Sequence, residues 1–157
     1  MEIYERNINV SCAMLENGNL RTKASLLDLN HNMRVELVIA QESRTIIDAR
    51  AHMVKVPFHV CILTTSRLDN IIGFRIERGI NRRLGDALGR SEGCSHLFEL
   101  ALEAVRLSSN ILLGFSHMEE EWRDRRMDDE AFIEKAKPFL KNSCLPFYES
   151  EPGGNAQ

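Results

Sequence analysis

Three short stretches of this chain carry side chains that bind soft metal ions or act as nucleophiles. Asp28 and His31 form a D-x-x-H pair, Cys61 follows Pro57 by four residues, and Cys94 stands two residues before a histidine. Carboxylate oxygen, imidazole nitrogen and thiolate sulfur are all ligands of zinc and iron in proteins. Because no pair has the C-x-x-C spacing, a buried core thiol and a polar loop histidine stay open as alternative interpretations.

The elements that must position these residues begin with strands. Apolar and polar residues alternate in four segments, at 7–14, 20–29, 33–40 and 47–53. A period of two is typical of half-buried strands. Short polar segments at 16–19 and 41–44 join neighbouring strands, so we expect two antiparallel hairpins in one sheet. Cys12 lies on an alternating strand face, and we interpret it as a core thiol.

Helical spacing replaces this alternation after Pro57. Glycines end three predicted helices, which cover residues 60–72, 80–88 and 94–114. A last helix over 129–140 is predicted to begin at Asp128 or Asp129 and to be disturbed near Pro138. Cys144, beyond that helix, is interpreted as a second core thiol. The pattern predicts an α+β fold in which helices pack on one face of an antiparallel sheet of about four strands, with long C-terminal helices.

Length and composition are those of an ordinary globular domain. The chain has 157 residues, of which 43% are hydrophobic and 27% charged, and its net charge of -3 does not indicate nucleic-acid binding. The N-terminal sequence has acidic residues early, and no apolar run approaches the roughly 20 residues of a membrane span. We expect a single domain over 1–150, a disordered tail over 151–157, and a cytoplasmic location.

Each of the three chemical stretches lies at a boundary between predicted elements. Asp28 and His31 precede a strand, Cys61 follows the sheet, and Cys94 begins the long helix. Residues at such boundaries can meet at one end of a domain that stacks helices on a sheet. We therefore predict that these four residues form one site.

Helical geometry separates Cys94 from His96. At about 100° per residue, Cys94 shares the inward direction of Leu97 and Ala101, whereas His96 falls beside Glu99 on the polar side. We predict that Cys94 points into the site. His96 is expected to support a ligand from outside the coordination sphere or to face a partner.

The segments IIDARAHMVKVPFHVC, LDNIIG and GCSHLFELALEAV occur in this order between residues 33 and 110. In this they resemble the NifU-like family of iron-sulfur assembly scaffolds, which has an I-x-D-A-x-F strand, a G-C motif, a helix ending in glycine and an H-C-S-x-L-A helix start. The resemblance implies that Cys61 and Cys94 match the scaffold's second and third cysteine ligands. The first scaffold cysteine is absent, and the segment DLNH at its place implies that Asp28 or His31 substitutes for it.

The order D-x-x-H, P-x-x-x-C and G-C-x-H-L also resembles that of an uncharacterised bacterial family. The leading hypothesis is a soft-metal-binding protein whose site contains His31, Cys61 and Cys94, with Asp28 as the fourth ligand or as a water-orienting group. The expected cofactor is zinc or iron, the iron as an ion or as an iron-sulfur cluster.

The expected partners are proteins that donate or accept metal or sulfur, with no nucleic acid and no membrane. The oligomeric state stays open, with a homodimer as one alternative. Two other functions stay open. One is a cysteine-dependent enzyme in which a neighbouring histidine activates Cys94 as the nucleophile. The other is a non-catalytic protein-interaction module whose cysteines are packed in the core.

Overall fold

The computed structural model describes residues 1–117 and 126–149. The chain divides into two compact units, Met1–Leu112 and Leu113–Gln157, and each is described by itself. The tail that we expected to be disordered, residues 151–157, lies outside the described residues. No helix within the described ranges is both long enough and apolar enough to cross a membrane.

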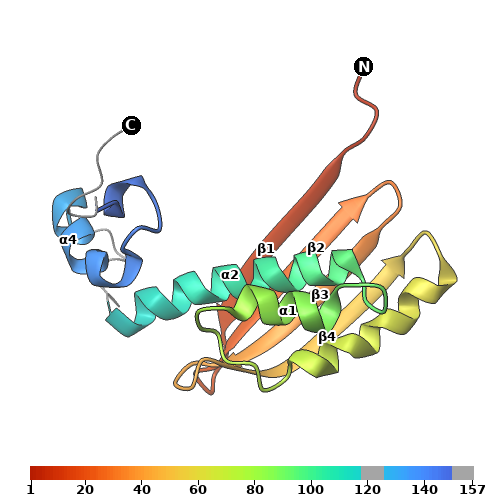
Figure 1. Ribbon diagram of the computed structural model, residues 1–157, viewed down its shortest axis with the longest axis horizontal. Helices are drawn as coiled ribbons and strands as arrows, with labels where there is room; N and C mark the ends of the chain where they lie inside the picture. Colours follow the sequence, from red (N-terminus) through yellow and green to blue (C-terminus); the bar gives the residue numbers. More distant parts are fainter. Residues whose placement is uncertain (118–125, 150–157) are drawn as a thin grey trace. The chain divides into compact units, whose positions relative to one another are not determined.

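The first unit contains a four-stranded antiparallel sheet in the order β1-β2-β3-β4 (Figure 1). The strands are β1 (Arg6–Met14), β2 (Leu20–Asp28), β3 (Asn32–Ala40) and β4 (Thr45–Lys55). All four predicted strands are confirmed. The first turn forms at the predicted place because Gly18 takes a φ of 79° and the Asn17 side chain accepts a hydrogen bond from the amide of Asn19.

The two faces of the sheet differ in polarity, as the alternation predicts. One face buries Leu20, Leu26, Val35 and Leu37 almost completely. The opposite face carries polar residues such as Arg34, which is exposed. Helices can therefore gain free energy by packing on the apolar face alone.

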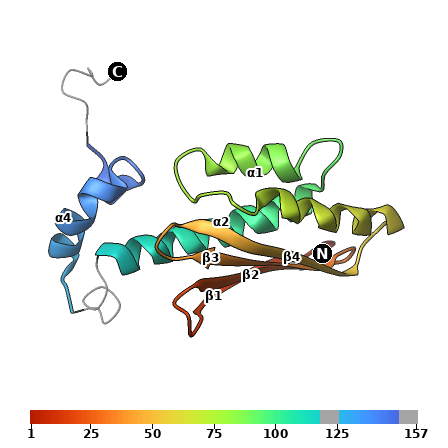
Figure 2. The same ribbon diagram turned by 90° about the horizontal axis from the view of Figure 1, so that it is seen from below.

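Three helices lie on this side of the sheet, as Figure 2 shows, and the second of them is the farthest from the strands and packs on the first. They are η1 (His59–Ile71), α1 (Ile80–Leu88) and α2 (Ser95–His117). The α+β architecture with helices on one face of the sheet is thus confirmed. The α2 helix buries Leu97 and Ala101, and its buried Ser108 hydroxyl lies 2.7 Å from that of Thr22 on β2.

Two helices differ from their prediction in detail. The η1 segment is a 3-10 helix, in which the hydroxyls of Thr64, Thr65 and Ser66 each donate to the carbonyl three residues earlier. Such side-chain bonds compete with the regular α-helical pattern. The predicted end of α2 at Gly114 is wrong, because the helix continues to His117 with Gly114 buried inside it.

The second unit contains α4 (Asp129–Leu140) and a short 3-10 turn, η2 (Leu145–Phe147). The predicted start of α4 is confirmed, since the Asp128 carboxylate accepts a hydrogen bond from the amide of Ala131 at 2.8 Å. The interpretation of Cys144 as a core thiol is wrong. Cys144 is exposed where it precedes η2, and Phe147 fills the small core instead.

Candidate functional site

The D-x-x-H pair closes the turn between β2 and β3. The Asp28 Oδ1 atom accepts hydrogen bonds from the backbone amides of Asn30 and His31, both at 2.8 Å, and from the His31 ring nitrogen Nδ1 at 2.9 Å. An aspartate that bonds the backbone two and three residues later is a common way to form a tight turn. Because a carboxylate only accepts, Nδ1 of His31 carries the proton and Nε2 is left with a free lone pair in the neutral ring.

The Asp28 carboxylate is an anion buried from solvent, with a side-chain exposure of 0% against 9% for His31. Burial acts to raise its pKa. Hydrogen bonds from the amide of Asn30, the His31 ring and Tyr4 outweigh that effect and hold the pKa of Asp28 well below its usual range. The second oxygen, Oδ2, lies 2.9 Å from the guanidinium Nη2 of Arg6 on β1. Both carboxylate oxygens are therefore engaged.

His96 lies against His31. Their ring centroids are 4.0 Å apart with a tilt of 43°, and Nε2 of His96 is 3.4 Å from Nη2 of Arg6. Burial is the main cause that lowers the pKa of His96, and the charges of His31 and Arg6 lower it further. The lowered pKa favours the neutral imidazole, which is the form that binds metals.

His96 was expected to support a ligand from outside the coordination sphere or to face a partner, and the structure places it against the ring of His31, one of the predicted ligands. Glu99 does share its side of α2, but that side faces the guanidinium of Arg6, whose Nη1 is 3.6 Å from Glu99 Oε2. We refer to Arg6, Asp28, His31, His96 and Glu99 as the histidine cluster. Arg6 was missed in the sequence, because nothing local marks a strand residue that reaches partners 22 and 90 residues away.

Cys94 is the residue that precedes the first turn of α2. Its carbonyl accepts from the amide of Phe98 at 3.0 Å, and its own amide donates to the Leu88 carbonyl at 2.8 Å. The side chain is half-buried and packs against the hydrophobic core. The turn depends on Gly93, where a Cβ would lie 2.0 Å from the Leu88 oxygen. Because Cys94 lies outside the regular helix, its direction is not tied to the helical spacing that separates it from His96.

Cys61 lies near the beginning of η1 and is half-buried. The preceding strand ends at Lys55, which pairs with Asn32 next to His31 and donates through Nζ to the Leu29 carbonyl at 2.5 Å. The β2–β3 turn, the start of η1 and the start of α2 thus lie at the same end of the sheet, as Figures 1 and 2 show. The backbone segments that carry Asp28, His31, Cys61 and Cys94 thus lie at one end of the domain, as we expected of element boundaries.

The side chains are not gathered into a closed ligand set. In the part of the chain that the structure describes, no three or more His, Cys, Asp or Glu residues lie together in a way that could hold a metal ion. The structure joins Asp28 to His31 and adds His96 to them. The ligand set of Asp28, His31, Cys61 and Cys94 stays a prediction.

The donor chemistry of these residues nonetheless fits a soft metal. The free Nε2 of His31, the neutral ring of His96 and the thiols of Cys61 and Cys94 are nitrogen and sulfur donors, which zinc and iron accept. A carboxylate that holds the other ring nitrogen of a histidine is also a recurrent support for metal-bound imidazole.

Comparison with known proteins adds a family and no activity. Residues 4–108 match the model of a family described as "Protein of unknown function (DUF2889)". This match includes every residue of the histidine cluster and both Cys61 and Cys94. Neither the curated proteins nor the solved structures include a match. Because the family model covers about two thirds of the chain, this protein belongs to the DUF2889 family.

Proposed function

We propose that this protein binds one soft metal ion, zinc or iron, at the end of the sheet that carries the histidine cluster. The observation that carries the proposal is the 2.9 Å hydrogen bond between the buried Asp28 Oδ1 and His31 Nδ1. It orients the ring and leaves Nε2 as the donor, the role that carboxylates play next to metal-bound histidines.

His31, Cys61, Cys94 and His96 would supply two nitrogen and two sulfur donors, and the Nε2 of His96 would exchange its 3.4 Å contact with Arg6 for the metal. Asp28 would act from outside this set, because its two oxygens already accept from His31 and Arg6. A small closing movement of the η1 and α2 starts is required, since the described residues hold no preassembled group of three donors. A set of two thiolates and two imidazoles is typical of structural zinc.

The resemblance to NifU-like scaffolds supports a role in handling metal or sulfur, with partner proteins that donate or accept it. On these scaffolds a transferable cluster relies on three thiolates, and of the three cysteines in the described first unit only Cys61 and Cys94 lie at that end of the sheet. A single zinc or iron ion is therefore the occupant that we propose, ahead of an iron-sulfur cluster.

Metal content of the protein purified without an affinity tag, under anaerobic conditions, tests the proposal. We expect about one equivalent of zinc or iron per chain, lost in His31→Ala and in Cys94→Ser. His52→Ala and Cys144→Ser are matched controls, because both residues are exposed and lie outside the histidine cluster. A protein that is metal-free as purified and also fails to bind added zinc would overturn the proposal.

The His96→Ala variant decides the composition of the site. Its contact with the His31 ring leads us to expect metal loss as large as in Cys94→Ser. Full metal content in His96→Ala would instead show that His96 is not a ligand and only supports the site from outside the ligand set.

A cysteine-dependent enzyme is the second candidate, favoured by the position of Cys94 directly before a helix of 23 residues and close in sequence to His96. In that case a histidine would accept the thiol proton and the thiolate would attack the substrate. Metal-free protein should then alkylate at Cys94 much faster than at the exposed Cys144. Equal alkylation rates at the two residues would exclude this function.

A further inference from the structure

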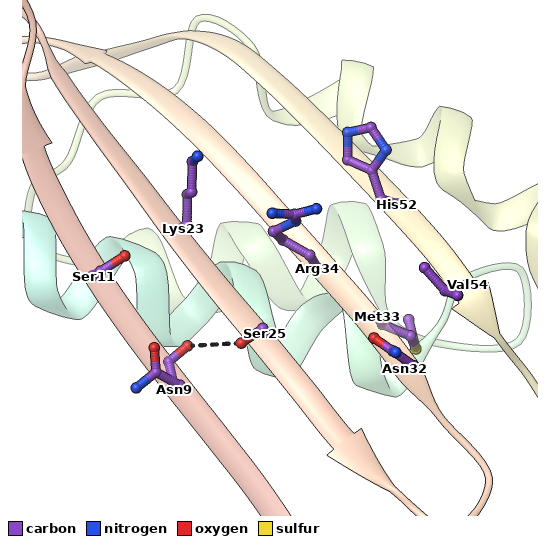
Figure 3. Close-up of a pocket in the computed structure, with 9 residues that line it drawn as sticks. All are labelled: Asn9, Ser11, Lys23, Ser25, Asn32, Met33, Arg34, His52 and Val54. Atoms are coloured by element: carbon purple, nitrogen blue, oxygen red, sulfur yellow. Dashed lines mark hydrogen bonds between the residues drawn. The ribbon is translucent and has the colours of Figure 1, made fainter.

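The face of the sheet opposite the helices carries a line of polar side chains that crosses all four strands. The register pairs Asn9 with Ser25, Ser25 with Arg34, and Arg34 with His52. Side chains at paired positions lie about 5 Å apart on the same face of a sheet. Arg34 and His52 are thus presented side by side, with two neutral hydrogen-bonding residues continuing the line (Figure 3).

A hollow of about 340 Å³ lies over this line. That volume falls at the lower end of the range for small-molecule sites, about 300–1,000 Å³. The described residues that line the hollow are Asn9, Ser11, Lys23, Ser25, Asn32, Met33, Arg34, His52 and Val54. None of these nine is an aspartate or a glutamate, although the whole chain is acidic.

Two basic side chains of the hollow, Arg34 and His52, are available to a ligand. The third, Lys23, forms an ion pair with Glu36 at 3.3 Å. Arg34 and His52 are exposed, and among the described residues neither has a hydrogen-bond or ion-pair partner. An arginine fork beside lysine, serine and asparagine donors matches the several acceptor oxygens of a phosphate group.

An apolar side chain, Val54, lies exposed at one end of the hollow, close to Asn32 (Figure 3). A ligand with a phosphate group and a compact apolar part would use both kinds of contact. A nucleic acid is a poorer fit, because sheet faces that bind single strands stack bases on aromatic side chains. None of the nine lining residues is a phenylalanine, tyrosine or tryptophan.

We propose that this open sheet face binds a small phosphate ester. Its phosphate lies between Lys23 and Arg34, and its apolar part lies toward Val54. This site lies on the face of the sheet opposite the core and is separate from the histidine cluster. Phosphate binding at this face is therefore tested independently of metal binding.

An NMR titration of the isotope-labelled full chain with phenyl phosphate tests the proposal. We expect saturable shifts of backbone amides in β2, β3 and β4 around Arg34, and an affinity that falls about tenfold or more in Arg34→Gln, as when a charged hydrogen bond is lost. Lys23→Gln should weaken binding in the same direction. Arg82→Gln, an exposed arginine on α1, is the matched control and should leave the affinity unchanged.

Three results would overturn the proposal. They are shifts that spread over the surface without saturating, an unchanged affinity in Arg34→Gln, and binding of oligothymidylate at the same amides that is tighter and increases with its length. The last would identify single-stranded nucleic acid as the occupant.

Discussion

Replacing Gly93 by alanine tests whether the start of α2 supplies a metal ligand. The amide of Cys94 donates to the Leu88 carbonyl at 2.8 Å, and this tight turn leaves no room for a side chain at residue 93. A Cβ there would lie 2.0 Å from the Leu88 oxygen and 2.2 Å from the Gly89 oxygen. Both are backbone atoms of a helix end, so they cannot rotate away.

The displacement can be worked out from these distances. Ordinary van der Waals contact begins at 3.4 Å, so the contact with the Leu88 oxygen must open by about 1.4 Å. Metal-ligand distances tolerate only about 0.2 Å. A shift several times larger takes the Cys94 thiol out of ligand range. We therefore expect Gly93→Ala to weaken zinc binding by about 100-fold, the upper end of the loss seen when only the support of a ligand changes.

Competition titration against a chromophoric zinc chelator measures this loss, and urea unfolding measures the cost to the fold, which we expect to be about 1–3 kcal/mol. Gly85→Ala is the matched control. Its Cβ would meet only the Phe98 ring, at 3.7 Å, so zinc affinity should be unchanged and the free energy of unfolding should rise by about 0.5–1 kcal/mol. A folded Gly93→Ala protein with wild-type zinc affinity would refute the place of Cys94 among the ligands.

Three further predictions follow from the buried polar contacts. Asp28→Asn should reduce zinc affinity by about 10–100-fold, because the amide holds the His31 ring less strongly; an unchanged value in the same titration would argue against an orienting role. Acid should destabilise the fold in two ranges. Because the pKa of His96 is lowered in the folded protein, the unfolded chain binds this proton first, and the fold loses stability as the pH falls below the unfolded pKa of about 6.5. The pKa of Asp28 is lowered as well, and the stability that its carboxylate contributes at neutral pH is lost below about pH 4. Thermal melts from pH 3 to 8 should show both losses, and His96→Gln should remove the upper one. Ser108→Ala should lower the free energy of unfolding in urea by about 1–3 kcal/mol, because it leaves the buried Thr22 hydroxyl without its oxygen partner. The double variant with Thr22→Val should lose less than the sum of the two single losses. Additive losses would contradict this explanation.

The sequence by itself determined the elements and most of their boundaries, although not the end of α2. Period-two alternation and short polar turns are local properties, so the four strands and their two antiparallel hairpins could be predicted from them. The same holds for the aspartate cap of α4 and for the glycine after α1. The D-x-x-H pair was also recognisable, because an aspartate that closes its own turn acts over three residues.

Only the tertiary structure decided what surrounds this pair. Arg6 and His96 reach Asp28 and His31 from a strand and a helix far along the chain, and a helical wheel reports which residues share a side without reporting what that side faces. The wheel correctly placed His96 with Glu99, yet the polar side of the first turn of α2 meets a guanidinium rather than solvent. Long-range contacts of this kind depend on how the sheet and helix stack, because packing and buried charge act through space and leave no period in the sequence.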